Sequence, residues 1–156
     1  MGTDVVTDPD YELWVLLHQA CDAMNRAREN ELRQVGLSGV QAAVLFIVKA
    51  MKVPATPGEI SRWLFRKPHT VSGLLYRMEK QGLVRKVKDL ERKTLVRVVI
   101  TERGEEAYQG STEMKVIHKM LSCLPPKERD NLRAYVTTLR NKALGECGVG
   151  YRLPFP

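Results

Sequence analysis

The side chains whose types and spacing suit chemistry fall within one short stretch near the middle of the sequence. Hydroxyl and imidazole groups, which approach bases and phosphates closely, are mixed there with cations that attract phosphate. No carboxylate pair, activated nucleophile or set of metal ligands accompanies them in the sequence. The stretch comprises Arg66, Lys67, His69, Thr70, Ser72 and Arg77.

Two successive short helices are expected to position these groups. Thr56 is a suitable N-cap for the first helix, with Pro57 in its first turn and Glu59 at the capping-box position. Pro68 opens the second helix, which we expect to run to Gln81. Apolar residues at three- and four-residue spacing predict its buried face, namely Val71, Leu74, Leu75 and Met78. The polar candidates then lie on the opposite face, either as a recognition surface or as an ordinary solvated one.

A predicted β-hairpin follows, with a polar turn at Lys88–Thr94 between two β-rich runs. Asp89 and Glu91 lie in the same turn, and we expect them to orient Arg92 by local ion pairing. A hairpin of this kind can lay an arginine along a minor groove or bind phosphate. The alternative is a solvated turn whose charges protect an edge strand. The cations of the turn are Lys88, Arg92 and Lys93.

The positive charge of the chain is concentrated in this unit. From Arg62 to Arg103 there are twelve Lys and Arg against four Asp and Glu, a net charge of +8. The whole chain of 156 residues carries +7, so the remainder sums to −1. Such a basic unit is expected of a protein that docks on a phosphate backbone.

The flanking segments read as amphipathic helices. A long first helix is expected at 10–35, with Asp8 or Asp10 as its cap, and a central apolar helix follows Ser38. After the hairpin, Thr101 caps a helix expected to run to about Ser122. Pro125 and Pro126 then precede a last amphipathic helix at 127–144. The fold class is therefore mainly α with a small β-hairpin. The apolar stripes at both ends exceed what one small lobe can bury.

Several classes of protein find no support in the sequence. There is no apolar run of the roughly 18 residues that a membrane span needs, and the acidic N-terminus does not resemble a signal peptide. Three widely spaced cysteines, Cys21, Cys123 and Cys147, are typical of reduced thiols in the cytoplasm. Cys21 is expected to be a small buried hydrophobic residue. We expect no metal, no cofactor and no enzymatic activity.

The order of these segments resembles the MarR family of winged helix-turn-helix transcription regulators. HTVSGLLYRMEKQGLVRKV resembles the family's recognition helix, its exit and its first wing strand. VRVVITERGEEAY resembles the second wing strand and the start of the fifth helix, and LPPKERDNLRAYVTTL the closing helix. The resemblance covers roughly residues 10–145. Two departures stand out: the family often has arginine where Gly73 stands, and its acidic-basic wing pair comes one position early here. We favour Arg92 over Lys93 as the counterpart of the wing arginine.

The resemblance implies a homodimer built from the first helix and the last two, with two recognition helices meeting a pseudo-palindromic operator in double-stranded DNA. It implies a single domain over 1–156, with a DNA-binding lobe at 37–100 and dimerisation helices at 10–35 and 101–146. It also implies a small aromatic or lipophilic effector between these regions. Trp14, His18 and Tyr108 are candidate lining residues, although core packing is the alternative role for each.

The expected function is a dimeric, sequence-specific DNA-binding regulator in the cytoplasm, a repressor released by a small-molecule ligand. Two alternatives stay open from the sequence. One is a winged-helix module that binds an acidic protein partner, and the other is a DNA-binding regulator that responds to cysteine oxidation. The tail residues Tyr151, Leu153 and Phe155 are expected either to dock on a surface or to be loose.

Overall fold

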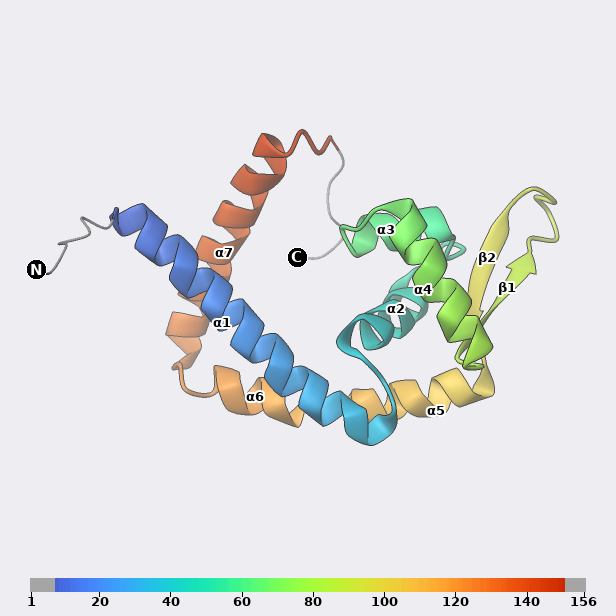
Figure 1. Cartoon of the computed structure of the whole chain (residues 1–156), viewed down its shortest axis with the longest axis horizontal. Helices are drawn as coiled ribbons and strands as arrows, with labels where there is room; N and C mark the ends of the chain where they lie inside the picture. The colour runs from blue at the N-terminus through green and yellow to red at the C-terminus, as the bar shows by residue number, and fades with distance from the viewer. Residues whose placement is uncertain (1–7, 151–156) are drawn as a thin grey trace, which may run out of the picture.

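The computed structural model describes residues 8–150, so the tail residues Tyr151, Leu153 and Phe155 lie outside the described part. It is mainly helical with one two-stranded antiparallel sheet, which confirms the predicted fold class (Figure 1). The elements in chain order are α1 (Pro9–Leu32), the 3-10 turn η1 (Arg33–Val35), α2 (Gly39–Ala50), α3 (Pro57–Trp63), α4 (Pro68–Lys80), β1 (Val84–Lys88), β2 (Val96–Ile100), α5 (Glu102–Ser111), α6 (Lys115–Leu121) and α7 (Pro126–Glu146).

The helices begin at the side chains that the sequence indicated. Asp8 caps α1, since its Oδ1 accepts hydrogen bonds from the backbone N–H groups of Asp10 and Tyr11. Ser38 and Gln41 form a complete capping box at the start of α2. Thr56 Oγ1 accepts from Glu59 N at the start of α3. The Glu59 carboxylate pairs with Arg62 and does not complete the predicted capping box with the Thr56 backbone.

One hydrophobic core holds the helix pair and the hairpin together. α2 lies at its centre, with Val44 and Leu45 fully buried. The expected inner face of α4 is confirmed, because its apolar residues are the buried ones. The core residues are Leu32, Leu37, Ala42, Val44, Leu45, Ile47, Ala55, Ile60, Val71, Leu74, Leu75, Met78, Leu83, Val84 and Val98.

Two glycines are required where α4 passes into the hairpin and where α5 packs against that junction. Gly82 ends α4 with a φ of 72°, in the left-handed region that glycine adopts without steric cost. Gly104, in the first turn of α5, lies against the strand's start, where an added Cβ would stand 2.0 Å from Leu83 O. β1 and β2 then pair in register from Val84↔Ile100 to Lys88↔Val96.

The helix expected from Thr101 to about Ser122 is in fact two helices, and this prediction was wrong. The chain breaks after α5 and resumes at α6, with Met114 in the left-handed conformation at a φ of 49°. The hydroxyls of Ser111 and Thr112 both turn back onto carbonyls three residues earlier. Such local hydrogen bonds compete with continuation of the helix.

The molecule divides into two halves in space (Figure 1). α2, α3, α4 and the hairpin form one half, while most of α1 extends with α6 and α7 into the other. The second half is hardly covered by its own chain, since α7 buries none of its residues and α1 only Leu32. Within residues 8–150, no single helix has the length and apolar character of a membrane span. Only the bent pair α1–η1 and α2 meets that criterion together, by length and composition.

Candidate nucleic-acid interface

The N-terminal end of α4 is the polar end that the sequence predicted. Lys67 occupies the N-cap and makes no side-chain hydrogen bond to the first turn. The positive end of the helix dipole therefore has no internal anion, which favours a phosphate at this end. His69, Thr70 and Ser72 follow within the first two turns, and all three are exposed.

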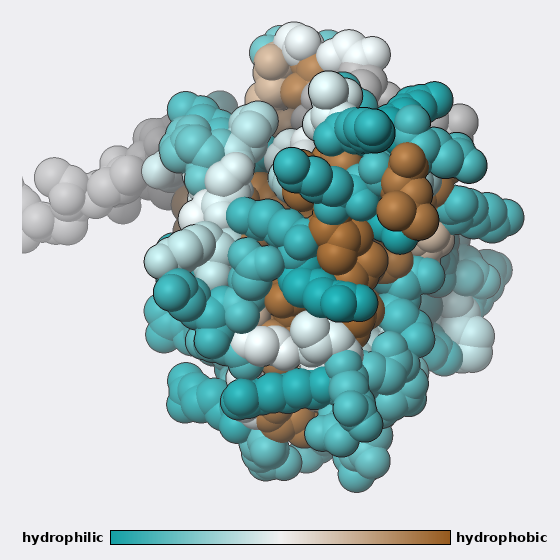
Figure 2. Space-filling view, turned by 90° about the vertical axis from the view of Figure 1, so that its right-hand side faces the viewer, coloured by the Kyte–Doolittle hydropathy of each residue, from teal (hydrophilic) through white to brown (hydrophobic). Residues whose placement is uncertain are grey.

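The nine side chains singled out from the sequence are all exposed in the structure. Six belong to α4 or the turn before it, one is the last residue of β1, and two lie in the hairpin turn. Figure 2 views the molecule from the side that carries the hairpin, and hydrophilic residues cover most of that side. An apolar patch interrupts this polar cover. The nine residues are Arg66, Lys67, His69, Thr70, Ser72, Arg77, Lys88, Arg92 and Lys93.

The turn between α3 and α4 fixes the position of the Arg66 backbone. Phe65 has a φ of 51°, a left-handed conformation that is uncommon outside glycine. Phe65 N donates to Arg62 O over 3.1 Å, and Arg66 N donates to Ser61 O over 3.0 Å. These two bonds close the end of α3 as a Schellman-type cap, so the chain enters α4 in one defined direction.

The hairpin turn is held by Asp89, though not in the way we expected. Its Oδ1 accepts hydrogen bonds from Glu91 N and Arg92 N, each 2.9 Å long. The backbone closes the turn further, with Asp89 N donating to Leu95 O and Leu95 N to Arg92 O. No ion pair between these carboxylates and Arg92 occurs among the described residues, so the predicted ion pairing was wrong. Asp89 orients Arg92 through its backbone instead.

The same hydrogen bonds set the charge of Asp89. The N–H groups of Arg92 and Glu91 bond to its carboxylate and hold the pKa of Asp89 below its usual range, with a smaller attraction from Arg97 and Arg92. The Asp89 carboxylate is therefore ionised, and fully able to accept both hydrogen bonds, at neutral pH.

The recognition helix and the hairpin are tied to each other and to the core. The Glu79 carboxylate accepts from Lys86 N over 2.9 Å, which joins the last turn of α4 to β1. Val98 N donates to Ala55 O over 2.7 Å, which joins β2 to the loop before α3. Helix and hairpin therefore present their cations in a fixed relation to one another.

Comparisons with known proteins agree with this geometry. The model of the MarR family matches residues 35–93, whereas no curated protein matches the chain. The organohalide-sensing transcriptional regulator RdhR-CbdbA1625, in its 2,4-dichlorophenol-bound form, is 28% identical with a TM-score of 0.88. The match covers 100% of this chain and 95% of that one. Residues 35–93 thus match the MarR family, and the whole chain shares the fold of this regulator.

Two further MarR-family structures share the fold at lower identity. The S. aureus MepR–DNA complex is 20% identical with a TM-score of 0.78, over 87% of this chain and 99% of that one. A mutant of E. coli MarR complexed with operator DNA is 19% identical with a TM-score of 0.77, over 85% and 99%. Both of these relatives hold DNA, according to their descriptions.

Gly73, one of this chain's departures from the MarR pattern, is not required by packing. A Cβ placed there would meet only the Arg77 guanidinium, at an ordinary contact distance of 3.7 Å. Its position on the outer side of α4 has room for a side chain. The glycine therefore removes a possible DNA contact without filling a structural need.

The three candidate effector residues do not meet within one chain. Trp14 and His18 of α1 are both exposed and contact each other with ring centroids 4.3 Å apart and ring planes tilted by 47°. Tyr108 instead lines a cavity of about 210 Å³ between α1, α2 and α5. Phe46 and Arg28 line the same cavity, and sequence reasoning missed both.

Sequence reasoning also missed an ion pair that spans the break between α5 and α6. Arg28 pairs with Glu31 and donates to Ser111 O over 2.7 Å, at the last residue of α5. Glu31 accepts from Val116 N over 3.0 Å, near the start of α6. Burial opposes ionisation of Glu31, but the Val116 N–H and Arg28 outweigh it and lower the Glu31 pKa. One partly buried pair thus satisfies both ends of the break.

The cysteines and histidines form no site within residues 8–150. Cys21, Cys123 and Cys147 are free and exposed, so the expected burial of Cys21 does not occur in the single chain. The described residues contain no group of three His, Cys, Asp or Glu side chains that could hold a metal ion.

Proposed function

We propose that the protein is a homodimeric regulator that binds a pseudo-palindromic operator in double-stranded DNA and represses transcription. The observation that carries the proposal is the exposed, uncapped, cationic start of α4 beside an ordered cationic hairpin turn. The family and fold are those of transcription regulators. We place its action in the cytoplasm and assign it no enzymatic role.

Within this proposal the nine exposed side chains have two kinds of role. His69, Thr70 and Ser72 read base edges in the major groove, because short side chains at a helix start reach them. The cations on α4 and the hairpin bind phosphates or the minor groove and give salt-dependent affinity. Residues 37–100 then make up the DNA-binding lobe, with 10–35 and 101–146 forming the dimer.

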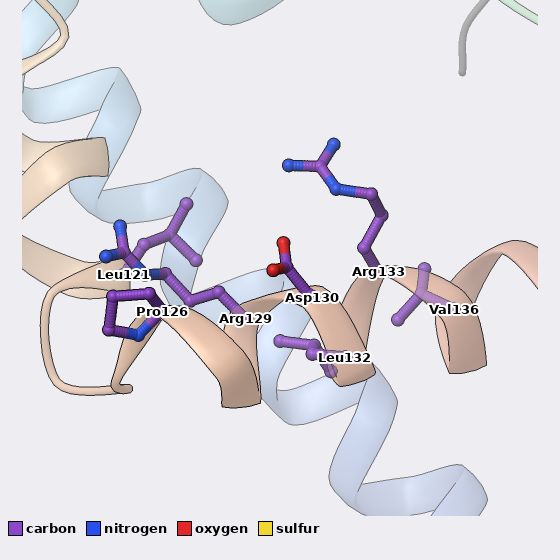
Figure 3. A pocket seen from close by; sticks show the side chains of 7 residues that line it. All are labelled: Leu121, Pro126, Arg129, Asp130, Leu132, Arg133 and Val136. Atoms are coloured by element: carbon purple, nitrogen blue, oxygen red, sulfur yellow. The ribbon is translucent and has the colours of Figure 1, made fainter.

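Unburied apolar surface supports the dimer. Tyr135, Leu139 and other large apolar residues of α7 are exposed, as are Leu13 and Trp14 of α1. An open groove of about 540 Å³ runs along α7 from its junction with α6 (Figure 3). A second copy that lays the same helices against this groove would cover it, giving an isologous interface. The groove is lined by Leu121, Pro126, Arg129, Asp130, Leu132, Arg133 and Val136.

Selection of bound fragments from the source genome tests the DNA-binding proposal. A regulator should enrich a small set of fragments, protect one site on each in footprinting, and lose affinity steeply as salt rises. The competing role, a module that binds an acidic protein, predicts no preferred fragment and no footprint. That result would overturn the proposal.

We further propose that the cavity between α1, α2 and α5 holds a small aromatic effector that releases the operator. Its volume suits a single substituted ring, since an apolar cavity of about 150 Å³ already binds benzene. Tyr108 and Phe46 supply aromatic walls, and the Arg28 guanidinium, already paired with Glu31, offers a further hydrogen-bond donor to a ligand oxygen. Trp14 and His18 do not line this cavity in their own chain. In the dimer they either reach the ligand of the partner subunit or pack in the interface.

The effector proposal is tested with 2,4-dichlorophenol, the ligand named for the RdhR relative. We expect it to weaken operator binding by the parent protein. Ala43 also lines the cavity, so Ala43→Leu should fill it and abolish the response while DNA binding persists. A variant that responds like the parent would place the effector elsewhere.

A further inference from the structure

The hairpin turn carries an apolar side chain that the DNA-binding proposal does not use. Leu90 lies between Asp89 and Glu91 and is 89% exposed, more than any other large apolar residue in the described chain. Scattered exposed leucines are common on protein surfaces. Leu90 differs from them because it lies at the hairpin turn and its side chain is held in one outward direction.

Leu90 points away from the body of the protein although three apolar side chains are available beside it. A cavity under the turn is lined by Val53, Pro54 and Leu95, together with Asp89 and Glu91 on either side of Leu90. Leu90 itself does not line it. The leucine therefore gains no packing from its own chain.

The turn holds Leu90 in this outward position. Both hydrogen bonds to Asp89 Oδ1 come from the two residues after the leucine, Glu91 and Arg92. The Leu90–Glu91 and Glu91–Arg92 peptide groups are thereby fixed. The leucine side chain is therefore presented with little further loss of backbone entropy on binding. Asp89 and Glu91 flank the leucine directly, and the exposed cations Lys88, Arg92 and Lys93 follow beyond them, so the turn keeps a net positive charge.

An exposed apolar tip on a turn with a net positive charge matches the minor groove. Phosphates on both strands attract the cations, and leucine is one of the side chains that proteins insert between base steps to unstack and bend a duplex. A single side chain is far too small for a protein interface, which needs about 800 Å² on each partner.

We propose that Leu90 is a DNA-contacting residue that enters the minor groove as an apolar wedge, next to Arg92, and favours operators with a deformable step there. The inference rests on the proposed DNA-binding function. Pyrimidine–purine steps such as TA and CA unstack most easily, so they should give the tightest binding under each hairpin. Leu90 would then add specificity by shape, at a position without hydrogen-bonding groups.

The test uses the full-length protein and an operator fragment recovered by the genomic selection. We expect Leu90→Ala to weaken operator binding roughly tenfold and to reduce the DNA bend, while Leu90→Met stays within about twofold because it keeps an apolar wedge. Val53→Ala, which removes another exposed apolar side chain, should leave affinity and bend unchanged. Bending is read by energy transfer between the duplex ends, and unstacking by 2-aminopurine at the step beneath the hairpin.

A second comparison separates a wedge from a general loss of affinity. Replacing the deformable step by an A-tract should weaken the parent protein roughly tenfold but hardly affect Leu90→Ala. The wedge would be overturned if parent and Leu90→Ala bound and bent the operator equally. It would also be overturned if Leu90→Ala lost the same affinity on the operator and on the A-tract duplex. A changed oligomeric state in Leu90→Ala would assign the residue to a protein contact and also overturn it. A parent that binds no duplex would defeat the proposed function together with this inference.

Discussion

At the scale of single residues, the backbone conformation of the hairpin turn between β1 and β2, the wing, depends on the carboxylate of Asp89. Asp89 orders the residues that follow it by accepting hydrogen bonds from Glu91 N and Arg92 N. The sequence could identify the cations of this turn because charge is visible in composition. It could not distinguish an ion pair from a backbone cap, because both need an acidic residue two or three positions away.

Asp89→Ala should disorder the turn and weaken operator binding roughly fivefold, because Arg92 loses its fixed position. Asp89→Asn keeps an oxygen acceptor, so it should retain most of the affinity. Amide hydrogen exchange at Glu91 and Arg92 reports the order directly. Since the folded-state pKa of Asp89 is lowered, the cap is complete above the normal aspartate pKa and is lost only as pH falls through the lowered value. Slow exchange that persists in Asp89→Ala would exclude this role.

Arg92→Ala should weaken binding to the operator and to unrelated duplexes alike, and reduce the slope of log affinity against log salt by about 1. The reason is that a phosphate or minor-groove contact carries charge with little base information. Lys119→Ala, on the exposed side of α6, is a suitable control. An unchanged slope in Arg92→Ala would mean that another cation fills this role.

At the scale of elements, the sequence predicted helices best where a cap marks their ends. α4 lies where Pro68 and Gly82 placed it, since both residues act through their own backbone geometry. The break between α5 and α6 left no such mark. Beside the local bonds of the Ser111 and Thr112 hydroxyls, the break depends on Arg28 and Glu31, which are more than 80 residues earlier in the chain. Such a distant contact cannot be inferred from local periodicity.

Glu31→Gln should destabilise the fold by about 1–2 kcal/mol at neutral pH, because Arg28 is only 16% exposed and loses its charged partner. The lowered pKa of Glu31 means that its contribution is complete above the unfolded-state value. The difference between variant and parent should therefore shrink as pH falls below about 4.5. Urea unfolding over a pH series measures it, with Glu106→Gln on an exposed carboxylate as control. A difference that is independent of pH would argue against the ionised pair.

Gly73→Ala should stabilise the fold by about 0.5–1 kcal/mol, because alanine loses less backbone entropy in a helix and its Cβ meets no close neighbour. Thermal unfolding measures the gain. Gly73→Arg has the same room and should also raise DNA affinity by adding a cation to the outer side of α4. A loss of stability in Gly73→Ala would reveal a contact at this face that the single chain lacks.

At the scale of the whole molecule, α7 and most of α1 are left largely uncovered by their own chain. Leu132, Val136 and Leu139 recur on one side of α7 and all are exposed. The sequence revealed this surplus of apolar surface, but not its geometry, because an interface between copies needs coordinates for both. The same limit applies to Trp14 and His18, whose surroundings depend on the second copy.

The double variant Leu132→Asp and Val136→Asp should be monomeric in sedimentation and should lose specific operator binding. Charges buried against the partner would be unpaired, and one lobe alone contacts only half a site. The melting temperature of the parent should rise with protein concentration, as expected for a dimer. Thr138→Asp, on another side of the same helix, provides the control. A parent protein that stays monomeric at high concentration would refute the dimer.

The uncovered closing helix has a genetic consequence. Subunits that dimerise through α1 and α7 will also form heterodimers between the products of two alleles. A subunit altered only in its hairpin turn therefore still pairs with normal subunits. A cell that expresses both forms equally would then hold about three defective assemblies for every sound one, by random pairing of two-fold subunits. Wing lesions in this protein are therefore expected to be dominant, whereas lesions that abolish pairing are expected to be recessive.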